Sequence, residues 1–169
     1  MTEIIFKPIG TVHSPFKQPQ GTPIQAAASR EAQGIIDLLP EYREGLQDLE
    51  GFSHLILLYH FHQSAGFSLK VKPFLDDEPR GVFATRAPAR PNPLGFSVVR
   101  LERVAGTRLY IREVDLVDGT PLLDIKPYVP QFDCREGARC GWLEENLEKL
   151  DVVRDDGRFL KRPEENSPS

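Results

Sequence analysis

Residues 96–117, FSVVRLERVAGTRLYIREVDLV, contain two segments in which apolar and polar side chains alternate with a period of two. These segments, Phe96–Val104 and Arg108–Val117, are rich in β-branched and aromatic residues. Successive side chains of a β-strand point to opposite faces, so the pattern predicts two half-buried strands. The same pattern recurs earlier in the chain, in Ile4–Val12, Gln33–Leu39, His54–Gln63 and Gly81–Arg86.

Turn residues separate these segments and define the expected fold. The chain has 15 prolines and 13 glycines, and turns spaced by roughly ten residues are typical of all-β folds. No glycine-rich Rossmann fingerprint follows any expected strand. We therefore expect a mainly β protein, a small antiparallel β-barrel with a few short helices: a helix over Gly141–Leu150 and a helical turn around Glu41–Leu49.

Length and composition predict one domain. The 169 residues, 40% of them hydrophobic, can bury a single core. We expect the barrel domain to span residues 1–160 and the polar tail 161–169, KRPEENSPS, to be disordered. The start, Met1–Gly10, does not resemble a secretory signal, and no apolar run is long enough to cross a membrane, so we expect a cytoplasmic protein. Cys134 and Cys140 fit plain thiols better than a zinc site or disulfide.

The charge of the chain is unevenly distributed. A net charge of -4 argues against coating nucleic acid by bulk electrostatics. Between residues 80 and 112, however, one acid, Glu102, accompanies the arginines Arg80, Arg86, Arg90, Arg100, Arg103, Arg108 and Arg112. Because the guanidinium group suits phosphate, this basic segment is compatible with an RNA footprint, and equally with a solvated strand face.

The segment ATRAPARPNPLGFS, residues 84–97, is a candidate binding loop. Its prolines, Pro88, Pro91 and Pro93, restrict the backbone between two expected strands. A loop held in this way would place Arg86, Arg90 and Asn92 at defined positions, as a binding site requires. The alternative is a rigid hairpin of structural value only.

A second candidate is DLVDGTPLLDIKPYVP, residues 115–130. Residues 118–121 predict a turn, and alternation in the strand that follows puts Asp124, Lys126 and Tyr128 on one face. Leu123, Ile125 and Val129 would then face the core. An acid, an ammonium and a phenol could perform acid/base catalysis, or the first two could form an exposed ion pair of little energetic value.

Histidines provide a third candidate. Alternation puts His54, His60 and His62 on one side of an expected strand. A metal site using His60 and His62 is conceivable, but the sequence nearby supplies no obvious third ligand, so the prediction is no metal.

Four segments in this order resemble the TsaA-like (TrmO) family: IGTVHSPF followed by PIQ, LEGFSHLILLYHFHQ, GVFATRAPARPNPLGFSVVRL and DLVDGTPLLDIKPYVPQFD. They cover roughly residues 4–133. The resemblance implies a non-Rossmann β-barrel methyltransferase that binds S-adenosylmethionine, forms a homodimer and methylates N6 of threonylcarbamoyl-adenosine beside the tRNA anticodon. It also implies cofactor-binding positions: Pro23, Ile24, Gln25, His62, Gln63, Arg86, Phe96, Asp115, Asp118, Gly119, Thr120 and Pro121.

The chain departs from the family at two points. The family more often has serine and a larger residue where this chain has Ala87 and Ala89, and longer bacterial members carry a C-terminal extension. Any side-chain contact that the family makes at the first two positions is absent here, and the extension is a candidate aid to tRNA binding.

Three functions therefore remain in competition. In the first, Asp124 or Tyr128 removes a proton, Lys126 stabilises negative charge, and Arg90, Asn92 and Arg103 contact the tRNA anticodon arm. The second is an inactive tRNA or small-ligand binding module, and the third is a metal enzyme based on histidine.

Overall fold

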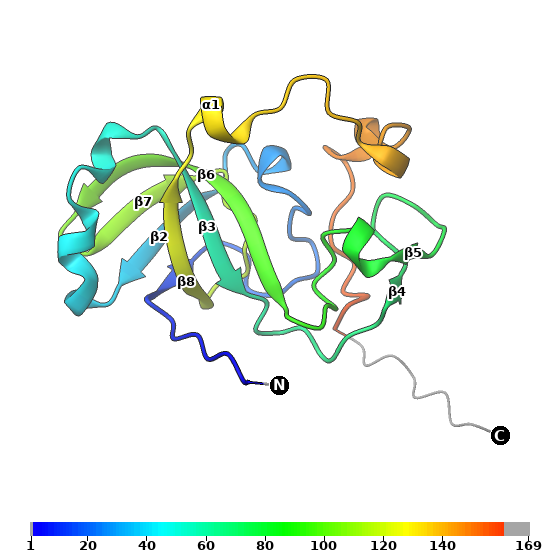
Figure 1. Ribbon diagram of the computed structural model, residues 1–169, viewed down its shortest axis with the longest axis horizontal. Coiled ribbons are helices and arrows are strands. Elements are labelled where there is room, and N and C mark those ends of the chain that lie inside the picture. The colour runs from blue at the N-terminus through cyan, green and yellow to red at the C-terminus, as the bar shows by residue number, and fades with distance from the viewer. Residues whose placement is uncertain (1, 161–169) are drawn as a thin grey trace.

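The computed structural model describes residues 2–160. Six strands form a closed barrel in the order β1-β2-β7-β6-β3-β8, in which every pair of neighbours is antiparallel. The short strands β4 and β5 pair with each other beside the barrel (Figure 1). A mainly β protein with a small antiparallel barrel is therefore confirmed. The strands are β1 (Gly10–His13), β2 (Gln33–Leu38), β3 (His54–His60), β4 (Lys70–Val71), β5 (Arg80–Gly81), β6 (Leu94–Ala105), β7 (Arg108–Arg112) and β8 (Thr120–Pro127).

The helices are short, as expected, but one expectation about them is wrong. Residues 141–150 form two 3₁₀ turns instead of one helix, because Asn146 between them has non-helical backbone angles. The Trp142 indole N–H donates to the Ala84 carbonyl at 2.9 Å, which directs this side chain toward a loop. The helical elements are η1 (Ala26–Ala28), η2 (Pro40–Leu46), η3 (Leu49–Gly51), η4 (Val82–Ala84), α1 (Pro130–Asp133), η5 (Gly141–Leu143) and η6 (Leu147–Lys149).

None of the helices within residues 2–160 combines the length and the apolar character needed to cross a bilayer.

Five expected strands are shorter in the structure, and of these the second ends at Leu38 and the last at Arg112. The first begins at Gly10, where Gly10 pairs with Leu122 of β8, and the residues before Ile9 have no strand partner among those described. The third ends at His60. The segment expected over 81–86 continues β5 for one residue and then turns into η4. Alternation identifies a strand, but only a partner's hydrogen bonds fix where it ends.

A bulge changes which side chains of β8 reach the core. Leu58 pairs with Asp124 and Tyr59 with Leu122, so Leu123 is the extra residue. Leu122 is therefore fully buried, and the expectation that Leu123 faces the core is wrong. Ile125 does pack against the core, whereas Val129 lies beyond the strand, at the start of α1.

The barrel core consists of inward-facing aliphatic side chains. Burying one such side chain stabilises a fold by about 1.5–3 kcal/mol. The core also sets the strand register, because a slip of one residue would turn the buried side chains of a strand toward solvent. Its fully buried members include Val12, Ile36, Leu55, Leu57, Val99, Leu109, Ile111, Val114 and Leu122. The proline-rich segment, residues 84–97, is called the proline loop below. Its Ala87 and Ala89 form a smaller buried cluster with Val71 and Val82, and Phe159 packs against this cluster.

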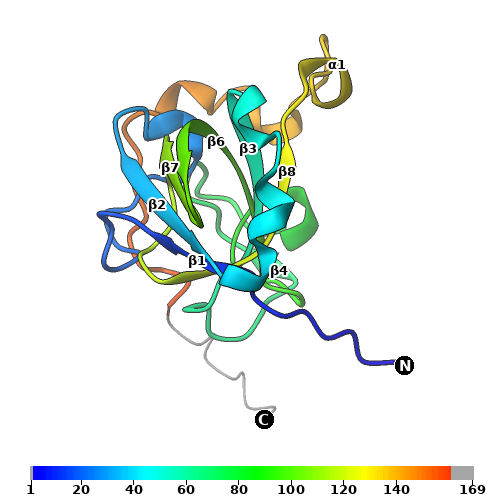
Figure 2. The same cartoon turned by 90° about the vertical axis from the view of Figure 1, so that its left-hand side faces the viewer.

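The last described residues, 154–160, run alongside two loops and are called the C-terminal strap below (Figures 1 and 2). The Gly21 N–H donates to the Asp155 carbonyl at 2.7 Å, and the Asp155 N–H donates to the Thr22 carbonyl at 3.0 Å. The Arg158 guanidinium donates to the Pro73 carbonyl at 3.0 Å. Backbone groups of Gly21 and Thr22 on one side and of Pro73 on the other therefore hold the strap in place. The predicted disordered tail, 161–169, lies outside the described residues.

Gly95 of β6 generates the first prediction. A Cβ at this position would overlap Cε2 and Cζ of the Tyr59 ring. Gly95→Ala should therefore lower the free energy of unfolding by about 1–3 kcal/mol, the usual scale of overpacking. Urea denaturation measures the change. Gly81→Ala is the matched control, because nothing lies within 4 Å of its added Cβ; equal stability loss in both variants would contradict the packing argument.

Candidate functional site

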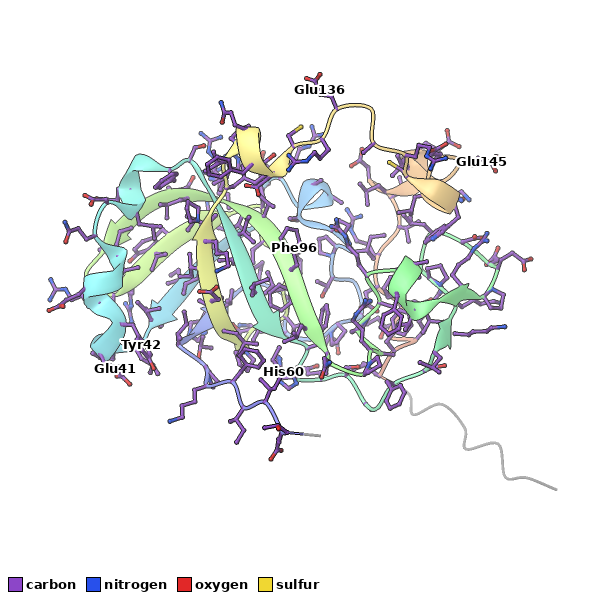
Figure 3. The ribbon with its side chains drawn as sticks, in the orientation of Figure 1. Glu41, Tyr42, His60, Phe96, Glu136 and Glu145 are labelled. Carbon is purple, nitrogen blue, oxygen red and sulfur yellow. The ribbon has the colours of Figure 1, made fainter. Side chains whose placement is uncertain are left out.

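A cavity of about 340 Å³ opens between the barrel, the proline loop and the strap. Its volume is in the range of small-molecule sites, about 300–1,000 Å³. The end of β3, the start of β6 and the segment after β7 form one side, and the loops before η1 and after β5 form another. Phe96 of β6 lies on the side of the barrel that faces these loops (Figure 3).

The structure brings most of the predicted cofactor-binding residues to this one cavity. Those in its wall are Pro23, Ile24, Gln25, His62, Gln63, Arg86, Phe96, Asp115 and Thr120. Asp118, Gly119 and Pro121 lie outside it. Asp118 instead holds the turn: its carboxylate accepts from the Ser14 N–H at 3.1 Å and from the Lys17 ammonium at 2.8 Å. The hydrogen bond from Lys17 lowers the pKa of Asp118.

Arg86 connects two parts of the cavity wall. Its guanidinium donates to the Gln25 side-chain oxygen at 2.8 Å. Its central carbon lies 5.7 Å from the centroid of the Phe96 ring, within cation–π range. A charged group and an aromatic face therefore occur together at one end of the cavity.

A chain of three hydroxyl and carboxyl groups runs from the barrel interior to the cavity. The Ser97 hydroxyl donates to Asp115 Oδ1 at 2.7 Å, and Tyr59 Oη lies 3.0 Å from Ser97 Oγ. Tyr59 and Ser97 are buried, whereas Asp115 retains surface toward the cavity. Burial raises the pKa of Asp115 to about 6 and raises the pKa of Tyr59 far above its ordinary value. Tyr59 and Ser97 are not among the predicted site residues, although both alternate onto the inner faces of their strands.

Histidine does not form a metal site among the described residues. His60, at the end of β3, is exposed, and His62 lies in the cavity wall. Two causes lower the pKa of His62: mainly its partial burial, and to a lesser degree the charge of the neighbouring His60. Within residues 2–160, no three His, Cys, Asp or Glu side chains gather closely enough to hold a metal ion. The third ligand that a site based on His60 and His62 needs is therefore absent from this part of the chain.

The predicted substrate-binding residues lie in different places. Arg90 is in the cavity wall, but its Nη1 donates to three nearby carbonyls, that of Val82 in η4 at 3.1 Å and those of Thr85 and Ala87 in its own loop at 2.8 and 3.3 Å. These hydrogen bonds of Arg90 therefore hold the loop together from within. Asn92 is exposed and lies outside the cavity wall.

The remaining arginines of the basic segment do not form a uniform positive surface. Acidic partners bind three of them, in the pairs Arg80–Asp76, Arg108–Asp37 and Arg112–Glu102. Arg103, also outside the cavity wall, stacks on Tyr110 at 3.4 Å from the ring centroid. Its charge has no carboxylate partner among the described residues, and the same is true of Arg100.

The predicted catalytic residues are not in the cavity wall. Asp124 and Lys126 share the outer face of β8, as expected, and their side chains form an ion pair at 2.7 Å. Both are substantially solvent-exposed, at 41% and 58%. Tyr128 lies beyond the strand, with its ring edge-on to His54 at 6.3 Å. The inner face of β8 is occupied by Leu122, which leaves these groups outside the barrel; their catalytic role stays a prediction.

The strap supplies a wall that sequence analysis did not identify. Asp155, Phe159 and Leu160 line the cavity, and the Phe159 ring packs edge-on against Phe74 at 5.1 Å. Burial raises the pKa of Asp155. The one sequence signal for this wall is the apolar pair Phe159–Leu160, immediately before the polar tail.

Comparison with known proteins gives consistent results. The family described as the tRNA-methyltransferase O N-terminal domain matches residues 11–134. A probable S-adenosyl-L-methionine-binding protein of Pyrococcus abyssi is 59% identical over 93% of this chain and 85% of its own length. The human tRNA (adenine(37)-N6)-methyltransferase is 36% identical over 86% of this chain. The crystal structure of TrmO from Pseudomonas aeruginosa matches with a TM-score of 0.72 and 44% identity over 83% of this chain.

The chain matches only part of the longer relatives. The matched region covers 34% of the human protein and 62% of the Pseudomonas chain. The family match also ends at residue 134, so the strap lies beyond it.

The hydrogen bonds of Arg90 in the proline loop generate a prediction. Arg90→Gln should lower the free energy of unfolding by about 1–3 kcal/mol, because three carbonyls lose a charged donor. Arg100→Gln serves as the control, since Arg100 is exposed and its side chain has no hydrogen bond among the described residues. Thermal melts monitored by circular dichroism compare the two. Wild-type stability in Arg90→Gln would show that these hydrogen bonds do not hold the loop.

Proposed function

The chain belongs to the family of the tRNA-methyltransferase O N-terminal domain, and from this premise we propose that it is an S-adenosylmethionine-dependent methyltransferase. Its substrate would be N6 of threonylcarbamoyl-adenosine in the tRNA anticodon loop. The observation that carries the proposal is the single cavity in which most of the predicted cofactor-binding residues meet. The name of the human relative supports methyl transfer to N6 of a tRNA adenine.

The chemistry of the cavity fits the cofactor. S-adenosylmethionine carries an ammonium, a carboxylate, a sulfonium and an adenine ring. The cavity wall contains two carboxyl groups, Asp115 and Asp155, and the aromatic side chains of Phe61 and Phe96. It also contains the guanidinium of Arg86, which makes no hydrogen bond to the carbonyls of its own loop among the described residues. Arg86 with Gln25 would hold a carboxylate, and the carboxyl groups would favour the cationic parts. When bound, S-adenosylmethionine supplies a methyl group activated by the positive sulfur.

The residues of the chain then have to align the reactants and exclude water. The strap contributes to both tasks, because Phe159 and Leu160 cover one side of the cavity. Backbone hydrogen bonds of Asp155 hold the start of the strap against the loop of Gly21 and Thr22. The ring of Phe74 supports Phe159 from behind. A wall fixed in this way needs no reordering when a ligand enters.

Two arginines are available for tRNA. Arg100 and Arg103 lie on the outer side of β6, and neither has a carboxylate partner among the described residues. Guanidinium groups in this position can bind the phosphates of tRNA. These local contacts would allow tRNA binding although the net charge of the chain is -4. Because tRNA is the proposed substrate, we place the protein in the cytoplasm.

An inactive binding module is the second candidate. It is favoured by the Pyrococcus relative, whose name states S-adenosylmethionine binding and no reaction. Ala87 and Ala89 do not separate the two candidates, because both are buried in the smaller cluster instead of facing the cavity.

Nucleoside mass spectrometry distinguishes the two candidates. Purified protein is incubated with S-adenosylmethionine and tRNA that carries threonylcarbamoyl-adenosine, and the nucleosides are compared with those from tRNA lacking this modification. The proposal expects one added methyl group on threonylcarbamoyl-adenosine alone. Cofactor binding without any methylated nucleoside would leave the binding module.

Arg86 and Arg103 should affect different ligands. Arg86→Ala should weaken S-adenosylmethionine binding about tenfold or more, as expected for losing a charged hydrogen bond in a ligand site. Arg103→Ala should instead weaken tRNA binding and reduce its logarithmic salt dependence by about 1, since one phosphate contact is lost. Calorimetry and filter binding measure the two affinities. Equal loss of cofactor affinity in both variants would contradict this division.

We also propose a homodimer with the proline loops near the interface. Phe83 and Leu94, at either side of the loop, expose 77% and 45% of their surface, which a partner would cover. Light scattering at micromolar concentration should give about twice the chain mass of 19.1 kDa. Phe83→Glu should shift the mass toward the monomer, whereas Phe132→Glu, a similarly exposed change on α1, should not. A monomeric wild-type protein would refute the dimer.

A further inference from the structure

The methyl acceptor proposed above needs a group that takes its proton, and the predicted groups on β8 are outside the cavity. A nitrogen bonded to both a purine ring and a ureido carbonyl is a weak nucleophile, because its lone pair is delocalised. Losing its proton restores the lone pair. The base therefore has to be a carboxylate or a neutral imidazole in the cavity wall. The candidates in the wall are Asp115, Asp155 and His62.

Asp115 differs from the other two candidates in how it is held. The Asp155 carboxylate already accepts the Gly157 N–H at 2.7 Å, within the turn of the strap. The His62 side chain is exposed, its neighbours are the His60 backbone and the Gln63 side-chain amide, and the Gln63 Nε2 lies 3.5 Å from His62 Nε2. Asp115 alone is bonded from inside the barrel, through Ser97.

The hydrogen positions in this chain of groups follow from counting donors. A serine hydroxyl has one hydrogen, and the hydrogen of Ser97 points to Asp115 Oδ1. The Tyr59 hydroxyl must therefore donate to Ser97 Oγ. Both hydrogens point toward the carboxylate, which fixes its orientation. The backbone N–H groups of Asp115 and Ala26 also act on this carboxylate and lower its pKa. Oδ1 accepts the Ser97 hydroxyl and Oδ2 accepts no side-chain hydrogen bond among the described residues, so we assign Oδ2 as the oxygen that receives a proton from the cavity.

We propose that Asp115 is the proton acceptor in methyl transfer, and that Ser97 and Tyr59 are positioning residues that orient its carboxylate. The inference rests on the proposed function, since it assigns a role within that reaction. As the acceptor nitrogen forms its bond to the methyl carbon, its proton passes to Asp115 Oδ2. The sulfur keeps the electron pair of the broken S–C bond and leaves as a neutral thioether. Bulk water then takes the proton from Asp115 and restores the carboxylate.

The charged and titratable groups around Asp115 determine its pH dependence. Burial raises its pKa to about 6, while the Ser97 hydrogen bond and the positive charge of Arg86 oppose this rise. Tyr59, the other titratable group that faces it, stays neutral because burial raises its pKa. A base works only when deprotonated, so the methylation rate should rise with pH through about 6 and then level off. A pKa near neutrality also suits a group that must both accept and release a proton.

The test combines a titration that needs no activity with a rate measurement. Carbon-13 NMR of the aspartate carboxyl groups should show one that titrates near pH 6 and disappears in Asp115→Asn. In Ser97→Ala this titration, and the rise of the rate with pH, should both move upward by about one unit, because the carboxylate loses its donor. Tyr59→Phe should give a smaller shift in the same direction.

In single-turnover assays, Asp115→Asn should lower the methylation rate by about 10² or more at pH 7.5, a usual scale for losing a general base. Its affinity for S-adenosylhomocysteine, measured by calorimetry, should fall far less than the methylation rate, because the carboxylate is one of several groups that face the ligand. Asp151→Asn, an exposed change just before the strap, is the control and should alter neither quantity. If Asp115→Asn fails to fold, Ser97→Ala alone tests the proposal, through the parallel shift of the NMR titration and the rate profile.

Several outcomes would overturn the inference. Loss of affinity for S-adenosylhomocysteine in proportion to the rate would make Asp115 a cofactor ligand only. An unchanged rate in Asp115→Asn, or a rate profile in Ser97→Ala that does not follow the NMR titration, would exclude it as the base. In either case an active wild-type enzyme would leave the proposed function intact. A wild-type protein that binds the cofactor and methylates no tRNA would remove the proposed function together with this inference.

Discussion

The contact between the Tyr59 ring and the backbone of Gly95 determines the geometry of the site. At this position β3 and β6 pair residue against residue, and any side chain on residue 95 would occupy the space of the ring. The ring therefore fills the end of the barrel, and its hydroxyl reaches Ser97 on the same strand as Gly95. Ser97 in turn binds Asp115, on the segment that follows β7. One close approach thus connects the packed core to the carboxyl group at the cavity surface, and each member of the connection is satisfied inside the protein.

The barrel supplies only part of the cavity, and irregular segments supply the remainder. The proline loop is held by Arg90 and by the small cluster that includes Ala87 and Ala89, while the strap is held by backbone hydrogen bonds. The strap depends on its neighbours, because its hydrogen bonds run to Gly21, Thr22 and Pro73, whereas Arg90 holds the proline loop mainly from within. This dependence is typical of binding sites, in which a rigid scaffold carries loops that hold the functional groups.

The sequence was sufficient to predict the barrel and the family, because alternation and turn residues are local signals. It also indicated residues that meet in one cavity, from Pro23 to Thr120, although that list came from resemblance and not from spacing. Three features could not be derived in this way. The bulge between Leu58 and Tyr59 alters the alternation on β8, and so exchanges Leu122 for Leu123 in the core. The interruption at Asn146 lies in its backbone angles, which the apolar spacing of residues 141–150 does not reveal. The inner position of Ser97 became meaningful only when Asp115, 18 residues away, was seen beside it.

The central claim is that ligand chemistry occurs in the cavity and not on the polar outer face of β8. Two-dimensional NMR of the labelled protein during titration with S-adenosylhomocysteine tests it directly. The account predicts that the largest chemical-shift changes fall on residues of the cavity wall, such as Ile24, Phe96 and Leu160, while Asp124, Lys126 and Tyr128 stay nearly unchanged. Shifts confined to Asp124–Tyr128, with none at Phe96 and Leu160, would contradict the account.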